Sequence, residues 1–373
     1  MANFYKKLDQ NNDVVNTRTL LHEAIPLTGT IVSGTYSESD QAVNVKNYSH
    51  GMFQSVYDYP FLSSSANHVF DITVGYSGES SLSASANNQN SKKINIYTQM
   101  AQVLMGYDQT GSILQFDEDG DLLAGGTKQK ESIFFNFSRL LVKDEIKKGS
   151  FNLELGVTNA FSEDGNVFNS RIKLTDTSGS SGYLVNSPVG EYGILYATQS
   201  AGTNVMKGLL NNEGAPVGLL FYQAGVAVIS GSIFKQQSAG GVLNNSYHNV
   251  SMSGPSSTSE TFEAMLTGSQ ISGAADNIRT RLYNISFNNT VELNSTVYFC
   301  RVHHNEYNYS SNPTYLSGSK IRVKTVKTDQ PVSYITTVGL YSDSNELMAV
   351  SKLSEPLKKT PDNEFTLRVR LDY

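Results

Sequence analysis

The residues best suited to bind a metal lie near the end of the chain, where Cys300 is followed by His303 and His304. A structural zinc site needs four ligands, commonly in closely spaced pairs. The remaining histidines are scattered, at His22, His50, His68 and His248. We therefore predict no metal site: Cys300 is expected to be a small buried apolar side chain on a strand, and the histidines to make polar contacts at the strand end. A metal held by these three residues is the alternative.

A second candidate is the acidic segment Asp117-Glu118-Asp119-Gly120-Asp121. A calcium-binding EF-hand loop has Gly at its sixth position and Glu at its twelfth. Counted from Asp117, the fourth residue is Gly120 and the twelfth is Lys128, so the segment departs from the pattern at both positions. We predict a solvated acidic turn, with calcium binding as the alternative.

Sequence patterns of nucleotide-binding and hydrolytic enzymes are absent from the 373 residues. The chain has no GxxxxGK[ST] phosphate loop, no GxGxxG between a strand and a helix, and no GxSxG nucleophile elbow. Charged residues make up 17% of the chain and Trp is absent, so a carboxylate pair that cleaves polysaccharides has little support. We predict a protein that is not an enzyme, with no catalytic residues and no cofactor.

The composition favours polar, uncharged contact surfaces on strands. Ser, Asn, Thr and Gly replace the missing charge, together with 21 Tyr and 17 Phe, which suit half-buried strand faces and interfaces. A net charge of −6 argues against nucleic acid and anionic membranes as partners. No stretch approaches the roughly 18 apolar residues of a transmembrane helix. The single Cys and the absence of a signal-peptide pattern predict assembly in a reducing cytoplasm.

The chain is predicted to be mainly β with a few short helices, between all-β and α+β, with antiparallel sheets in sandwich-like domains. Residues 1–35 are predicted to form an N-terminal arm with a short helix that ends at Pro26. Residues 36–130 are predicted to form a mixed α/β domain with one helix near 91–106, because apolar residues recur there at helical spacing and Gly106 is placed to end the helix.

Residues 131–258 are predicted to form a β domain. Its clearest unit is a hairpin at 217–234, in which two apolar strands flank a short loop that contains Gly225. Both strands are apolar on both faces, so the hairpin is expected at the centre of the core. Further strands are predicted at 133–137, 151–155, 171–175 and 193–196.

Residues 259–373 are predicted to form a short helix, at 259–272, and a C-terminal antiparallel β module. A turn at Asn288-Asn289 and a break between Pro356 and Pro361 are expected to interrupt the strands. The last strand is expected to place Phe365, Leu367, Val369 and Leu371 inward. The predicted strands are 282–287, 296–302, 320–326, 333–341, 346–352 and 364–371.

Segments of this C-terminal module resemble structural proteins of tailed bacteriophages, especially marine and cyanobacterial ones. The resemblance covers roughly the last quarter of the chain. This part of the sequence is similar to baseplate and fibre-attachment modules. It rests on Phe299-Cys300-Arg301-Val302 with Glu306–Thr314, on Tyr334–Tyr341 with Asn345–Leu353, and on the closing segment Phe365–Tyr373.

The resemblance implies a structural subunit of the virion, a tail or baseplate component that self-assembles into a homo-oligomer and holds neighbouring virion proteins. Such a protein would be made in the host cytoplasm and end in the virion. A neck, collar or capsid-decoration protein is the alternative, as is a receptor-binding or tail-fibre protein that contacts the host surface. Fibres usually carry repeats or heptads, and none is visible here.

Overall fold

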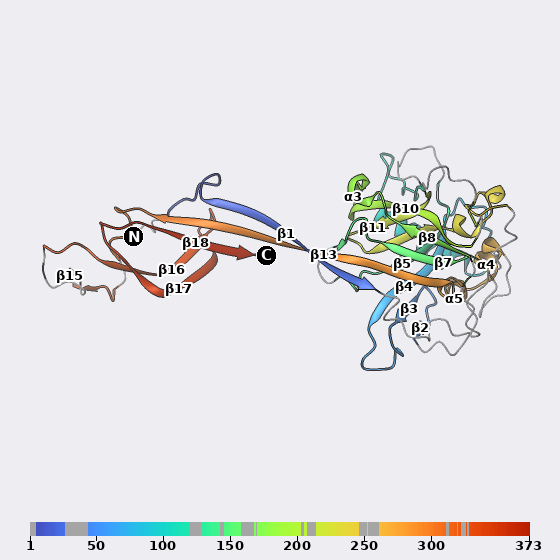
Figure 1. Ribbon diagram of the computed structural model, residues 1–373, viewed down its shortest axis with the longest axis horizontal. Coiled ribbons are helices and arrows are strands. Elements are labelled where there is room, and N and C mark those ends of the chain that lie inside the picture. Colours follow the sequence, from blue (N-terminus) through green and yellow to red (C-terminus); the bar gives the residue numbers. More distant parts are fainter. Residues whose placement is uncertain are drawn as a thin grey trace. The chain divides into compact units, whose positions relative to one another are not determined.

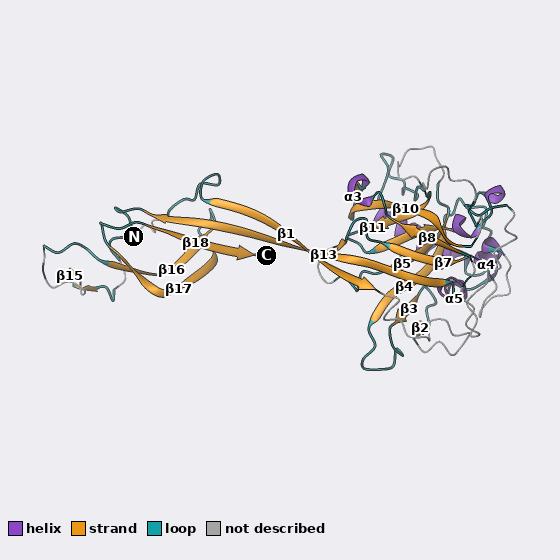
Figure 2. Cartoon of the chain, in the orientation of Figure 1, coloured by secondary structure: helices purple, strands orange, loops and turns teal. Residues whose placement is uncertain are grey.

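The chain folds into two compact units, drawn in Figure 1 from a computed structural model. Unit 1 comprises Met1–Leu21 and Glu292–Tyr373, and unit 2 comprises His22–Val291. Strands dominate the fold and the helices are short (Figure 2), so the predicted mainly-β class is confirmed. The structure describes residues 5–26, 44–118, 128–141, 145–157, 168, 170–202, 205–206, 214–245, 252, 261–310, 313–318, 320–321, 326 and 328–373.

Unit 2 is built on an antiparallel sheet with the strand order β13-β7-β8-β10-β11-β12-β5-β4-β3-β2. Two short strands flank this path, β6 (Glu145–Ile146) beside β13 and β9 (Leu184–Ser187) beside β10. The strands of the path are β2 (Val45–Asn47), β3 (Gln54–Tyr57), β4 (His68–Tyr76), β5 (Glu131–Asn136), β7 (Asn152–Gly156), β8 (Arg171–Thr175), β10 (Gly190–Ala201), β11 (Ala215–Phe221), β12 (Val226–Ser230) and β13 (Leu282–Val302).

The predicted central hairpin is confirmed by β11 and β12. The two strands pair from Phe221 and Val226 outward, and Gly225 closes the turn with a φ of 66° that favours glycine. Every residue of β12 is buried, as expected for a strand that is covered on both faces. The predicted divisions near residues 35, 130 and 258 stay predictions, and β4 pairs with β5 across the second of them.

Aromatic rings form the centre of the unit 2 core. The ring of Phe137 lies 6.0 Å from those of Phe70 and Phe151, between ring centroids, and 5.5 Å from that of Phe287. All four side chains are buried and belong to one continuous apolar cluster. Aromatic pairs at these separations add stabilisation beyond the burial of their surface.

The predicted helix near 91–106 is confirmed as α2 (Asn90–Leu104). Gly106 follows its C-cap with a φ of 80°, and its N–H donates to the carbonyl of Ala101, a common way to end a helix. The helix packs closely on β4 at Gly75, where a Cβ would lie only 2.7 Å from the carbonyl oxygen of Lys93. Glycine at this strand position therefore permits the close approach.

The single helix predicted at 259–272 is wrong, because two helices occupy this region: α4 (Phe262–Gly268) and α5 (Ile271–Arg279). Thr261 caps α4 by accepting the N–H of Ala264 at 3.1 Å. None of the described helices is long and apolar enough to cross a membrane. The remaining helices of the described residues are α3 (Gly179–Gly182), η4 (Gly231–Phe234) and η5 (Gln237–Ala239).

Unit 1 contains three described sheet regions. The end of β13 lies between β1 (Val14–Pro26) and β18 (Phe365–Asp372). Two further pairs of strands form separate two-stranded sheets. These are β16 (Ser333–Tyr341) with β17 (Leu347–Lys359), and β14 (Leu316–Ser317) with β15 (Lys320–Ile321).

Three local predictions for strands β1, β13 and β17 are wrong. The N-terminal segment before Pro26 is a strand, because β1 pairs with β13. The turn at Asn288-Asn289 is absent, because Asn289 pairs with Ile146 and β13 continues through it. The break predicted between Pro356 and Pro361 is wrong, because β17 continues through Pro356 to Lys359. Only its pairing with β16 is interrupted at Pro356. Most of the predicted strand at 320–326 lies outside the described residues.

The C-terminal hairpin and the last strand agree with prediction. Tyr341 pairs with Leu347 across the predicted turn, where Asn345 has a φ of 64°. In β18 the side chains alternate as expected: Val369 is buried, and Thr366 and Arg368 are exposed. β18 pairs with the end of β13 through a continuous register.

Candidate functional site

The residues that suggested a metal site lie at the end of β13. Cys300 is on the strand, and His303 and His304 follow its last residue. Cys300 is half-buried, and burial raises the pKa of its thiol, with a smaller contribution from the charge of Asp13. A raised pKa keeps the thiol protonated, whereas a metal ligand or a nucleophile requires the thiolate.

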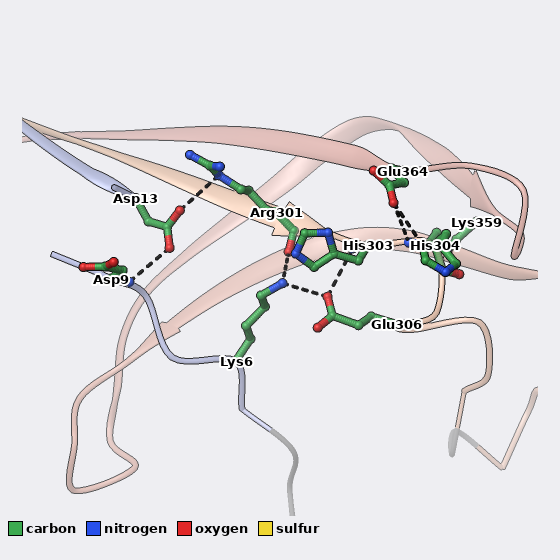
Figure 3. Close-up of polar contacts among 9 residues, drawn as sticks. All are labelled: Lys6, Asp9, Asp13, Arg301, His303, His304, Glu306, Lys359 and Glu364. Atoms are coloured by element: carbon green, nitrogen blue, oxygen red, sulfur yellow. Dashed lines mark hydrogen bonds and ion pairs between the residues drawn. The ribbon is translucent and has the colours of Figure 1, made fainter. Parts of the chain in front are cut away.

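The two histidines take separate partners (Figure 3). Nδ1 of His304 lies 3.1 Å from Oε1 of Glu364, whereas the backbone N–H of His303 donates to Oε2 of Glu306 at 3.1 Å. Polar contacts at the strand end, as predicted, are thus made by the His304 side chain and the His303 backbone. Among the residues that the structure describes, no group of three His, Cys, Asp or Glu side chains is placed to hold a metal.

A cluster of charged residues ties the N-terminal segment to the end of β13 (Figure 3). Nζ of Lys6 donates to the backbone oxygen of Arg301 at 2.8 Å and to Oε2 of Glu306 at 2.7 Å. The Nε of Arg301 lies 3.1 Å from Oδ1 of Asp13. We call Lys6, Asp13, Arg301 and Glu306 the N-terminal clasp. Lys6 and Glu306 are 300 positions apart in the sequence, so only the folded chain brings them together.

The electrostatics of the N-terminal clasp indicate a structural role. The hydrogen bond from Lys6, followed by that from the backbone of His303, lowers the pKa of Glu306. A carboxylate with a lowered pKa stays ionised near neutral pH and is a poor proton donor. Partly exposed ion pairs of this kind each contribute less than about 1 kcal/mol to stability, so the clasp mainly positions the N-terminal segment.

A second contact at this end of unit 1 involves a fully buried lysine. Nζ of Lys359 donates to the carbonyl of His304 at 3.0 Å, to Oδ1 of Asn308 at 2.8 Å and to the carbonyl of Thr360 at 2.7 Å. Three acceptors satisfy the three donors of an ammonium group. The end of β17 is thereby attached to the loop that follows β13.

The acidic segment is described only at its first two residues. Asp117 is fully buried and forms an ion pair with Lys128, and Glu118 accepts the hydroxyl of Ser230 at 2.6 Å. Asp117 is therefore not the solvated residue that we predicted, because the cation at the twelfth position neutralises it. Residues 119–121, the rest of the segment for which we predicted a solvated turn with calcium binding as the alternative, lie outside the described residues.

Sequence reasoning missed a group of residues with catalytic side chains on β3 and β4. The hydroxyl of Ser55 donates to Oδ1 of Asp71 at 2.5 Å, and Nε2 of His68 lies 2.6 Å from the same oxygen. In a nucleophilic triad the histidine lies between the hydroxyl and the carboxylate. Here the carboxylate lies between the other two, so His68 is not placed to accept the Ser55 proton. The available signal was the spacing of three positions between His68 and Asp71.

The most unusual surface belongs to the hairpin of β16 and β17. Its strands expose large apolar side chains by 43 to 70% of their area. We call this set the hairpin surface: Tyr334, Tyr341, Leu347, Met348 and Val350. Monomeric proteins rarely expose large contiguous apolar areas, and such areas commonly mark binding sites. The sequence signal was the lack of any charged residue over Ser333–Tyr341.

Comparison with known proteins finds no match to this chain among protein-family models, curated proteins or solved structures.

Proposed function

We propose that the chain is a structural subunit of a tailed-bacteriophage particle, a tail or baseplate component that self-assembles and holds neighbouring virion proteins. Its partners are copies of itself and other virion proteins, and its final location is the virion after assembly in the host cytoplasm. The proposal joins the resemblance of the C-terminal module to phage structural proteins with the physical character of unit 1. It assigns no catalytic step and no cofactor to the chain.

The scarcity of buried apolar side chains in unit 1 is the observation that carries this proposal. Among its described residues, the buried apolar side chains are four valines, each 5 to 7% exposed: Val297, Val302, Val332 and Val369. None of the four belongs to the continuous apolar cluster that fills unit 2. Burial of apolar surface is the main driving force of folding, so unit 1 has little of its own with which to offset the entropy of an ordered chain.

The arrangement of its strands leads to the same conclusion. An isolated two-stranded hairpin is marginally stable in water, yet β16 and β17 form a separate sheet in which only the end residues Ser333 and Lys359 are buried. A further protein surface that covers the hairpin would supply the missing burial. In a larger assembly, the surfaces of neighbouring subunits would cover the hairpin in this way.

The polar groups of unit 1 fit binding better than catalysis. The charges of the N-terminal clasp pair with one another, and Lys359 is held by three oxygen atoms. A catalytic acid or base has to be within hydrogen-bond reach of a substrate and titrate near the working pH. Groups that are already engaged in internal contacts hold the fold instead.

The proposal is tested by measuring the oligomeric state and the location of the full chain. We expect sedimentation velocity at micromolar concentration to show a defined oligomer. We also expect mass spectrometry of purified phage particles to detect the chain in several copies per particle. A chain that stays monomeric and is missing from purified particles would contradict the proposal.

A receptor-binding role is the second candidate, favoured by a cluster of aromatic rings at the edge of the unit 2 sheet. The rings of Tyr48, His50 and Phe53 lie 4.8 to 5.2 Å apart, between centroids, and His50 is exposed. Aromatic side chains of this kind suit adaptable recognition surfaces. Binding of the purified chain to host-surface glycans, and its loss in a Tyr48→Ala variant, would favour this role over a baseplate role.

A further inference from the structure

We infer that the hairpin surface is the contact through which one copy of this chain binds a second copy. The inference rests on the proposed function and adds to it the surface and the partner. Four properties of the hairpin support it: the distribution of its side chains, their packing, its unprotected edges and the charge balance of the unit to which it belongs.

Near its turn, the hairpin carries apolar side chains on both of its faces. Val350 pairs with Gly339 and, with Tyr341 and Leu347, belongs to the exposed hairpin surface. The neighbouring pair, Leu340 with Ala349, is only half-buried although it points to the opposite face. Strands that are apolar on both faces are typical of a position between two protein layers. In the single chain neither face of this hairpin is fully covered.

Close packing joins apolar side chains near the turn on the exposed face. A Cβ on Gly339 would lie 3.0 Å from a ring carbon of Tyr341 and 3.3 Å from a methyl carbon of Leu347, so these two side chains lie against the glycine. The ring of Tyr5 extends the surface, with 4.5 Å between its centroid and that of Tyr341. A rigid aromatic ring loses little conformational entropy on binding, which favours it as an anchor at interfaces.

Near the turn, the edges of the hairpin carry few of the charges that keep strands apart. Natural edge strands commonly carry lysine or other charged side chains, which prevent pairing with another chain. β16 has no charged residue, and in the paired part of β17 near the turn the only one is Lys352. The hairpin is therefore open to a neighbouring chain, as an interface strand needs to be.

The charge balance favours a second copy as the occupant. Unit 1 carries 13 Lys and Arg against 11 Asp and Glu, whereas unit 2 carries 15 against 23. Like chains repel one another through unit 2, but they can meet at unit 1 with almost no net repulsion. The uncharged, apolar character of the hairpin surface also matches the contacts between identical subunits, which are more apolar than those between transient partners.

The decisive experiment uses the full chain with Met348→Asp and Val350→Asp combined. Both side chains are exposed, so the substitutions leave the fold of the single chain intact, and circular dichroism should be unchanged. Buried between two copies, the added charges would repel each other and lose hydration, which should raise the dissociation constant about 100-fold or more. Sedimentation velocity over a range of concentrations measures this change.

The control is Leu62→Asp, which places one aspartate at a side chain of unit 2 that is 88% exposed. This variant should oligomerise like the wild type. A second measurement uses Cys300→Ser chains with one new cysteine: Met348→Cys should cross-link between copies with a short bismaleimide, and Leu62→Cys should not. Cross-links at position 348 locate the contact independently of any loss of affinity.

Three outcomes would overturn the inference. If the wild type forms an oligomer and the double variant forms it equally well, the contact lies elsewhere in the chain, and the proposed function stands. If the wild type is monomeric but the double variant is lost from particles, the hairpin surface binds a different virion protein. A wild type that is both monomeric and absent from particles would remove the proposed function as well.

Discussion

Unit 2 and unit 1 use the same antiparallel pairing but differ in what they bury. In unit 2 the strands, α2 and α5 enclose a continuous cluster of apolar side chains with phenylalanine rings at its centre. In unit 1 the described residues include four buried valines, and the larger apolar side chains of the hairpin remain exposed. Strand pairing is therefore alike in the two units, and the amount of buried apolar surface is what distinguishes them.

One device is common to both units, a buried ammonium group that is held by three oxygen atoms. Nζ of Lys93 donates to the carbonyls of Asn88, Leu266 and Ser269 at 2.5 to 2.8 Å. Leu266 and Ser269 lie at the end of α4, where the carbonyl groups of a helix lack partners and attract a cation. Lys359 performs the same task in unit 1 with one side-chain and two backbone oxygens.

The largest contrast is expected from truncating one core side chain in each unit. Phe137→Ala should lower the free energy of unfolding of unit 2 by about 3 to 5 kcal/mol, because it removes a ring that contacts several others. Val369→Ala should lower the stability of unit 1 by only about 1 to 2 kcal/mol, since two methyl groups are lost. Hydrogen exchange of peptides from each unit, followed by mass spectrometry, separates the two effects. Equal losses would contradict the contrast between the units.

Replacing the buried lysines probes the device that the units share. Lys93→Met and Lys359→Met should each destabilise their own unit by about 2 to 3 kcal/mol, because buried carbonyl groups lose their donor. Denaturant titration followed by circular dichroism gives the change, as the chain has no Trp for fluorescence. Lys92→Met, which replaces an exposed lysine next to Lys93, is the control and should change stability by less than about 0.5 kcal/mol.

A smaller contrast is expected from strand glycines. Gly75→Ala should cost about 1 to 3 kcal/mol, because the new methyl group would meet the backbone of α2, with 2.7 Å to the Lys93 oxygen and 3.0 Å to the Tyr97 nitrogen. Gly339→Ala should cost less than about 1 kcal/mol in the single chain, since exposed side chains there can move aside. Thermal unfolding of both variants ranks them, and the reverse order would show that unit 1 is the more tightly packed.

The smallest effect concerns the N-terminal clasp and acid. The carboxyl pKa of Glu306 is below its ordinary value of 4.5 in the folded chain, so the clasp contributes stability above about pH 4.5 and loses it as the pH falls through the lower, folded pKa. The contribution is less than about 1 kcal/mol, because both partners are partly exposed to water. A nuclear magnetic resonance titration of the Glu306 carboxyl should show the lowered midpoint. Lys6→Met should return this midpoint toward 4.5. An unchanged midpoint would show that Lys6 does not lower the pKa of Glu306.

Local patterns in the sequence predicted the elements in which the spacing of apolar side chains matches their burial. The alternation of Phe365 to Leu371 predicted the inward face of β18, and the uniform apolar strands at 217–234 predicted the buried hairpin. The helix at α2 was predicted because periodic apolar residues and Gly106 gave a consistent signal.

Errors arose where distant partners decide the local structure. Asn288 and Asn289 favour a turn by themselves, but pairing with β6 holds Asn289 in a strand. The α5 sequence contains Gly273 and Asn277, both weak helix formers, and burial against the unit 2 core stabilises the helix nonetheless. The N-terminal clasp and the exposure of the hairpin surface also depend on contacts between remote segments, which spacing along the chain does not encode.

Strand β1 has a consequence for the order of events on the ribosome. The hydroxyl of Thr296 donates to Oδ1 of Asn16, and the N–H of Phe299 donates to the carbonyl of Asp13, so β1 lacks these partners until β13 has been synthesised. The whole of unit 2 between them, His22–Val291, leaves the ribosome earlier. Translation thus completes the residues of the unit 2 core before the strands of unit 1 can pair, which shortens the time that nascent chains can aggregate.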